Sequence, residues 1–174
     1  MDPYEFRGTK RNEKDDMEKE LTAWLEGSER IVIAGVGSLL RSDDFVGMKI
    51  VRDLRGKVAD NVSLIECGTT PESFVDEIIE LRPTHVLVVD AALLDEPSGS
   101  TRLVNGLGAA SPAISTHTLP LQIFCEYLRS SLGAKVALLA IQPEKTGFGE
   151  GLSAEVEGSA SILVEVLAKV LLKT

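Results

Sequence analysis

Cysteine and histidine are scarce in this chain of 174 residues, which contains only two of each. The cysteines are Cys67 and Cys125, and the histidines are His85 and His117. Zinc sites built from four cysteines and frameworks of several disulfides are therefore excluded, although a single disulfide stays possible. Because cysteine and histidine ligands are so few, any metal site must draw on carboxylates, and the chain has 27 aspartates and glutamates to supply them.

Basic residues are outnumbered as well, since 18 lysines and arginines stand against 27 acids and give a net charge of −9. Proteins that bind the phosphate backbone need a surplus of positive charge to displace counterions, so we expect no nucleic-acid partner. Long apolar runs are also lacking. The runs at 86–89 and 136–141 are far too short to span a bilayer, so we expect no membrane insertion.

The N-terminal region has no apolar segment of the kind found in export signals. Residues 1–16 are charged and lack the apolar core that a signal peptide needs. We therefore expect a cytoplasmic protein whose two thiols stay reduced.

The length suits one domain, and the body of the chain contains no internal repeat or linker. Residues 1–14 mix both charges without a period, which predicts a charged flexible tail, whereas 15–174 are predicted to form a single domain. The domain opens with a helix whose apolar stripe is spaced at i, i+4, i+7 and i+8 and which ends at Gly27. The stripe consists of Met17, Leu21, Trp24 and Leu25.

Short apolar runs then alternate with amphipathic stretches. Strands are predicted at 31–34, 62–66, 86–89 and 136–141, with a short edge strand at 101–104. Helices are predicted at 46–54, 70–81, from Pro120 onward and at 156–171. Strands that are apolar throughout are typical of a parallel sheet buried on both faces. The alternation predicts the α/β class, as a three-layer α/β/α sandwich with a mainly parallel twisted sheet flanked by helices.

Candidate site residues follow from this prediction, because ligands of open α/β sheets bind at the carboxyl ends of the strands. Asp43 and Asp44 come after the first strand, Asp90 ends the third, and His117 precedes a helix. Two carboxylates and one imidazole at one edge suit a borderline divalent metal and leave positions open for substrate or water. Structural roles stay open for each: an Asp can complement a helix N-terminus or cap a loop, and a His can be an ordinary exposed residue.

A dinucleotide site is the first alternative. Gly35 and Gly37 begin a Gly-x-Gly-x-x-Gly pattern after a strand, but Leu40 stands at its third glycine position. Asp43 and Asp44 would also place negative charge where pyrophosphate meets a helix N-terminus. Both observations argue against nucleotide binding.

A cysteine nucleophile is the second alternative. A Cys67–His117 dyad is conceivable, although its sequence context matches no cysteine-protease signature. Cys125 lies within an apolar helical stretch and is interpreted as a core residue. His85 stands at the opposite, N-terminal end of its strand and is interpreted as structural.

Five motifs occur in order between about Arg30 and Ala168. Three of them are Gly35-Val36-Gly37-Ser38-Leu39-x-x-x-Asp43-Asp44-x-x-Gly47, Val88-Val89-Asp90-Ala91 and Ser115-Thr116-His117-x-x-Pro120. These three resemble motifs of the hydrogenase maturation endopeptidases. The other two are similar to motifs of the branch that serves [NiFe] hydrogenases of the formate-hydrogenlyase type. They are Gly68-x-x-Pro71-Glu72, and Ile141-Gln142-Pro143-Glu144 with Gly147-Phe148.

The resemblance implies an endopeptidase that removes a C-terminal extension from the hydrogenase large-subunit precursor after nickel insertion. The precursor would be the partner and would supply the nickel, and no organic cofactor is implied. By motif position the nickel-sensing residues fall on Asp44, Asp90 and His117, with Asp43 a further catalytic candidate for water activation or support. The precursor's C-terminal segment is expected along the substrate-binding residues Gly68, Thr69, Thr70, Pro71, Gln142, Pro143 and Phe148.

Two positions depart from the family pattern. Ser38 stands where Asn is usual and loses the amide donor, and Phe45 stands where Gly is usual and is expected to crowd or wall the site. A non-catalytic nickel- or precursor-binding chaperone on the same scaffold would carry the same motifs, so the sequence leaves that alternative open. The oligomeric state is open as well, and a monomer is compatible with the sequence.

Overall fold

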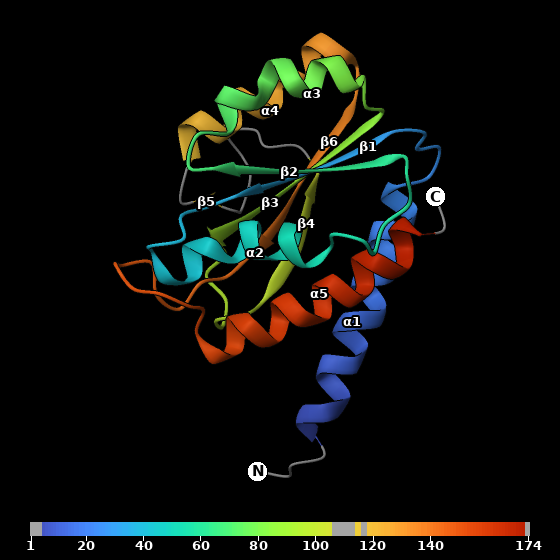
Figure 1. The fold of residues 1–174 in the computed structure, drawn as a ribbon. Coiled ribbons are helices and arrows are strands. Elements are labelled where there is room, and N and C mark those ends of the chain that lie inside the picture. Colours follow the sequence, from blue (N-terminus) through green and yellow to red (C-terminus); the bar gives the residue numbers. More distant parts are fainter. Residues whose placement is uncertain (1–4, 106–113, 116–117, 173–174) are drawn as a thin grey trace.

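The computed structural model describes residues 5–105, 114–115 and 118–172 (Figure 1). Its α-helices are α1 (Glu5–Trp24), α2 (Val46–Asp53), α3 (Val75–Leu81), α4 (Thr118–Leu132) and α5 (Ala154–Leu171). Its strands are β1 (Ile31–Val36), β2 (Val62–Gly68), β3 (His85–Leu93), β4 (Thr101–Asn105), β5 (Ile114–Ser115) and β6 (Lys135–Ile141). Two 3₁₀ turns, η1 (Ser42–Phe45) and η2 (Pro71–Phe74), precede α2 and α3.

The strands form one sheet in the order β2-β1-β3-β6-β4, and β5 pairs with β3 off this path. Strands β2, β1, β3 and β6 are parallel, whereas β4 runs antiparallel to β6 at an edge of the sheet. The central strands are apolar throughout because both of their faces are covered. The parallel strands therefore present their carboxyl ends along a single edge.

Helices cover both faces of the sheet, which confirms the predicted three-layer α/β/α sandwich (Figure 1). Helices α1, α2 and α5 pack against one face, where Ile31 and Ile33 of β1 join their core. Helices α3 and α4 pack against the other face, where Val32 and Ala34 point. Successive residues of a strand thus point into the cores on opposite faces of the sheet, as the two-residue period of a β-strand requires.

The first helix is longer than the sequence predicted. Its apolar stripe is buried as expected and includes Leu21, which is fully buried. However, α1 begins at Glu5, so residues 5–14 are helical where a flexible tail was predicted. Once the stripe at 17–25 fixes the later turns, adding a residue to the helix costs little, and charged residues propagate helix well without a buried face.

Three other elements differ from their predicted bounds. Asp90 does not end its strand, because β3 continues to Leu93 and there pairs with β5. The two-residue strand β5 was not predicted, and α4 begins at Thr118 rather than at Pro120. Within the described ranges, no helix combines the length and apolar character needed to cross a membrane.

Candidate functional site

Asp44 lies in the 3₁₀ turn η1 that follows β1, and its side chain is buried. Its Oδ2 atom accepts a hydrogen bond from the backbone N–H of Ser38 at 3.0 Å. The chain turns back at Gly37, which has a φ of 141° and where a Cβ atom would overlap the Asp44 carbonyl oxygen. Only glycine therefore permits the turn that brings Asp44 against the end of β1.

Asp90 is fully buried within β3. It lies on the same face of the strand as Val88, toward α3 and α4. Helix α2 begins close to this point, since a Cβ atom on Gly47 would overlap the carbonyl oxygen of Val89 and lie 2.5 Å from that of Val36. The start of α2 thus packs against the backbone of both β1 and β3. Asp44 and Asp90 lie near the carboxyl edge of these neighbouring strands.

Asp43 is also buried, but it faces the segment after β6. Its carboxylate accepts hydrogen bonds from the backbone N–H groups of Glu144, Lys145 and Ser153 at 2.7–2.9 Å. Burial acts to raise the pKa of Asp43, but these N–H groups outweigh it and hold the pKa below its ordinary value. Asp43 therefore stays ionised and fully engaged with its neighbours.

The predicted substrate-binding residues after β2 divide into two groups. Gly68 belongs to the frame of the edge, because its carbonyl oxygen accepts a hydrogen bond from the Gly37 N–H at 2.8 Å. Pro71 is buried at the start of η2. Thr69 and Thr70, by contrast, are exposed. The two threonines are therefore the part of this loop that a docked chain can reach.

The residues after β6 divide in the same way. The Oε1 atom of Gln142 accepts the N–H of Leu94 at 2.6 Å, its Nε2 donates to the carbonyl of Pro143 at 3.1 Å, and Pro143 is buried. Phe148 is 93% exposed. Leu40 lies beside it, because the N–H of Gly149 donates to the Leu40 carbonyl at 3.0 Å.

Leu39 and Leu40 were not predicted as part of the site. Both are about as exposed as a surface polar residue, at 52% and 57%, in a loop that carries Ser38 and Asp44. Their signal in the sequence is weak, because two leucines after a glycine turn look like the start of a buried helix. With Phe148 they form what we call the apolar rim, defined as Leu39, Leu40 and Phe148.

His117 lies outside the described residues. The structure does describe the chain on either side of it. Ser115 pairs with Ala92, two residues beyond Asp90, and α4 begins at Thr118. Within the described ranges, no group of three or more histidines, cysteines, aspartates or glutamates is placed to hold a metal ion.

A family model described as hydrogenase maturation protease matches residues 48–170. The chain belongs to the hydrogenase maturation protease family. A Methanocaldococcus jannaschii protein classed with the hydrogenase maturation proteases is 34% identical over 163 residues, which are 89% of this chain and 96% of that protein. The hydrogenase 3 maturation protease of Escherichia coli is 31% identical over 118 residues, 67% of this chain and 75% of its own length.

Solved structures agree with this assignment. The crystal structure of the [NiFe] hydrogenase maturation protease HycI from Thermococcus kodakarensis KOD1 has a TM-score of 0.80 and 34% identity to the chain. The match covers 87% of this chain and 97% of that one. The predicted family is therefore confirmed, and the chain is a peptidase of this group.

Neither cysteine of the protease is suited to act as a nucleophile. Cys67 and Cys125 are both free, and both are buried in the core between the sheet and helices α3 and α4. Burial raises the pKa of each thiol to about 12, so neither forms a thiolate at neutral pH. The Cys67–His117 dyad considered from the sequence is thus unfavourable.

His85 is structural, as its position at the start of β3 predicted. It is buried, its Nε2 atom donates to the carbonyl of Trp24 at 3.1 Å, and its ring meets the Trp24 ring edge-on. Burial, helped by the charge of Lys135, lowers the pKa of His85 below its ordinary value. The protease therefore keeps this imidazole neutral.

Phe45, which the sequence predicts to crowd or wall the site, packs against Arg52 of α2. The guanidinium carbon of Arg52 lies 5.2 Å from the centre of the Phe45 ring, in a cation–π contact. Arg52 also reaches Glu66 of β2 at 2.6 Å. The aromatic ring is thus tied to α2 next to the site.

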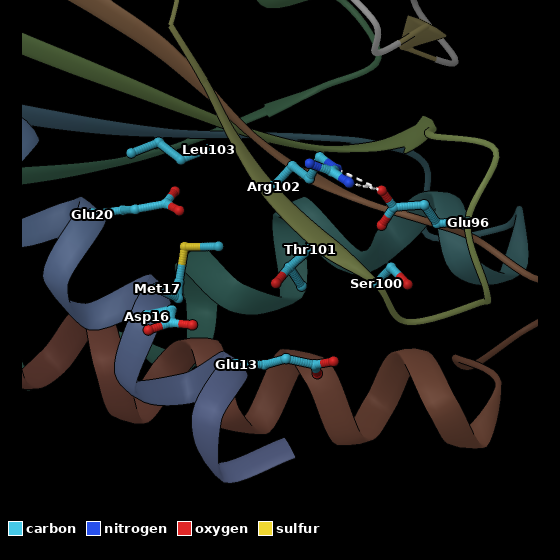
Figure 2. Close-up of a pocket in the computed structure, with 9 residues that line it drawn as sticks. All are labelled: Glu13, Asp16, Met17, Glu20, Glu96, Ser100, Thr101, Arg102 and Leu103. Carbon is cyan, nitrogen blue, oxygen red and sulfur yellow. Dashed lines mark hydrogen bonds and ion pairs between the residues drawn. The ribbon is translucent and has the colours of Figure 1, made fainter. Parts of the chain in front are cut away.

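A separate groove of about 370 Å³ lies between α1 and β4 (Figure 2). Its walls include the acids Glu13, Asp16 and Glu20 of α1, and an ion pair joins Glu96 to Arg102 across the β4 side. The groove contains none of the predicted site residues. It is therefore distinct from the carboxyl edge of the sheet.

Proposed function

We propose that this peptidase removes the C-terminal extension of a [NiFe]-hydrogenase large-subunit precursor after nickel has been inserted. The observation that carries the proposal is the pair of buried carboxylates, Asp44 after β1 and Asp90 within the neighbouring β3, in a hydrogenase maturation protease. The resemblance of the motifs at Gly68–Glu72 and Ile141–Phe148 supports a precursor of the formate-hydrogenlyase type. Both thiols are free, which agrees with a reaction in the reducing cytoplasm.

Nickel reaches the site as part of the precursor, held by that protein's thiolates. Asp44, Asp90 and His117 complete its coordination, because oxygen and imidazole donors suit a borderline divalent metal. The described neighbours of His117 support this assignment: Ser115 pairs with Ala92, and two further residues span at most about 7 Å. Asp90 also faces the side of the sheet that α4 covers, where His117 must join Thr118.

The precursor's C-terminal segment docks across the loops that border this edge. Thr69 and Thr70 offer exposed hydroxyl and backbone groups on one loop, and Phe148 offers an exposed ring on the other. Gly68, Gln142 and the buried prolines at 71 and 143 hold these loops in place. The apolar rim next to Asp44 suits an apolar side chain of the segment.

Water is the reagent that adds to the scissile carbonyl, since both thiols are buried and protonated. The water oxygen adds to the scissile carbonyl carbon and gives a tetrahedral intermediate. The proton that this water loses passes to the departing amine nitrogen as the C–N bond breaks, which releases the C-terminal peptide. Asp44 and Asp90 orient the nickel-bearing segment against the attacking water during this reaction.

Site variants test the proposal directly. His117→Ala, Asp90→Asn and Asp44→Asn should each lower cleavage of nickel-loaded precursor at least about 10–100-fold, the cost of disturbing a metal site. Asp60→Asn, an exposed acid in the turn before β2, is the matched control and should cleave normally. The measurement is the mass of the precursor before and after incubation, with circular dichroism to show that each variant is folded.

Two outcomes would count against the assignment. Normal cleavage by His117→Ala would remove that residue from the site. Tight binding of nickel-loaded precursor by the wild-type chain, with no change in the precursor's mass, would replace the protease with the chaperone alternative.

A further inference from the structure

Asp43 makes an unusually complete set of contacts for a carboxylate beside a site. Its Oδ2 atom accepts the N–H groups of Glu144 at 2.9 Å and Lys145 at 2.8 Å, and its Oδ1 atom accepts the N–H of Ser153 at 2.7 Å. The Ser153 hydroxyl lies 3.0 Å from Oδ1 and 2.9 Å from Oδ2. Both oxygens are thus occupied by donors from a segment more than 100 residues away.

These contacts do not suit a base that activates water. Asp43 is fully buried, so a water molecule from solvent cannot reach either oxygen without displacing a donor. Both carboxylate oxygens of Asp43 already accept backbone N–H groups, so neither is placed to take a proton from an attacking water. The chemistry of Asp43 is that of a fixed hydrogen-bond acceptor.

The segment that Asp43 holds runs next to the loop that carries Asp44. The N–H of Ser42 donates to the Gly149 carbonyl at 2.9 Å, and the N–H of Gly149 donates to the Leu40 carbonyl at 3.0 Å. Arg41 adds a contact from its Nε atom to the Thr146 carbonyl at 3.1 Å. Residues 144–153 therefore form a wall beside the site, with Phe148 exposed on it.

We propose that Asp43 is a positioning residue whose carboxylate clasps residues 144–153 against η1 and so sets one side of the peptide-binding surface beside Asp44. The inference rests on the proposed function for the identity of the peptide, whereas the clasp itself is independent of it. Asp43 takes no proton from water and touches no reacting atom. It acts by fixing where Phe148 and the neighbouring backbone meet the substrate.

The clasp is tested by hydrogen exchange without substrate. Asp43→Asn keeps the shape of the side chain but turns one acceptor into an NH₂ group that faces N–H donors. Hydrogen exchange at the amides of Glu144, Lys145 and Ser153 should become at least about tenfold faster, because each amide loses a hydrogen bond to a charged group. Asp44→Asn is the matched control and should leave these three amides protected, because Asp44 accepts from Ser38 instead.

The positioning role is tested by kinetics with nickel-loaded precursor. Asp43→Asn should raise KM about tenfold and leave kcat within about threefold, because the wall binds the peptide but does not take part in bond cleavage. Ser153→Ala keeps the backbone N–H and removes only the hydroxyl, so it should shift exchange and KM in the same direction by less. This milder variant also carries the test if Asp43→Asn does not fold.

Each contrary result has its own meaning. Unchanged exchange at the three amides in Asp43→Asn would overturn the clasp. A fall in kcat of about a hundredfold with KM unchanged would overturn the positioning role and restore Asp43 as a general base. If the wild-type protein does not cleave the precursor, the proposed function fails, and so does the role of residues 144–153 in binding the peptide. The exchange data still test the contacts between Asp43 and this segment.

Discussion

At the scale of single residues, Gly47 sets how closely α2 approaches β1 and β3. A Cβ atom there would overlap the backbone carbonyl oxygen of Val89, and backbone cannot move aside as a flexible side chain does. We therefore expect Gly47→Ala to lower the free energy of unfolding by about 1–3 kcal/mol, the cost of overpacking. The same change should impair cleavage, because it pushes α2 away from β1 and β3.

Gly158 provides the matched control for this prediction. It lies exposed within α5, and a Cβ atom there would meet nothing within 4 Å. Gly158→Ala should raise the free energy of unfolding by about 0.5–1 kcal/mol, since alanine is the better helix former. Urea denaturation of both variants measures the difference, and two shifts of the same sign would contradict the packing argument.

The sequence predicted part of the site because parallel strands end at one edge. Asp44, in the turn after β1, and Asp90, within the neighbouring β3, both lie near this edge. The sequence did indicate that β3 continues past Asp90, because Ala91, Ala92 and Leu93 are apolar. The aspartate was nevertheless interpreted as the end of the strand. No sequence pattern indicated the hydrogen-bond partners of Asp43, since contacts across more than 100 residues leave no local pattern.

At the scale of elements, α1 lies before the residues that match the family model yet contributes to the core. Leu21 is fully buried, so Leu21→Ala should lower the free energy of unfolding by about 2–5 kcal/mol. Lys14 pairs with Glu165 of α5 at 2.6 Å, but both side chains are substantially exposed, so Lys14→Ala should cost less than about 1 kcal/mol. Urea denaturation distinguishes the two, and equal losses would show that α1 is held by charge rather than by burial.

The elements that sequence patterns predicted are the ones that bury a continuous apolar surface. The central strands and the stripe of α5 were found because their periods report burial. Strand β5 was missed because two residues carry no period, and its pairing with β3 depends on tertiary structure. The early start of α1 was missed for the opposite reason, since a charged segment without an apolar period resembles a tail.

At the scale of the whole molecule, stability should depend on pH through His85. Burial lowers its pKa below the ordinary value of 6.5, so the unfolded chain takes up this proton first as the pH falls. The contribution is complete above about pH 6.5 and is lost progressively below it. Asp43, whose pKa is below the ordinary 3.8, adds a second loss only in stronger acid, as the pH falls through its folded value.

Urea denaturation at pH 7.5, 6.0 and 5.0 measures the first effect. The free energy of unfolding of the wild-type chain should fall across this range. His85→Asn, which keeps a donor for the Trp24 carbonyl but cannot titrate, should show a flatter profile. Parallel profiles for the two proteins would assign the pH dependence to other groups.

The long sequence separation of the contacts made by Asp43 determines when, during synthesis, they can form. Its donors lie 101, 102 and 110 residues further along the chain, so loop closure must be completed before they can meet. During synthesis the ribosome must release Ser153 before the wall can form, by which time β1, β3 and β6 have all emerged. Chains that end before Ser153 therefore lack the complete set of contacts to Asp43.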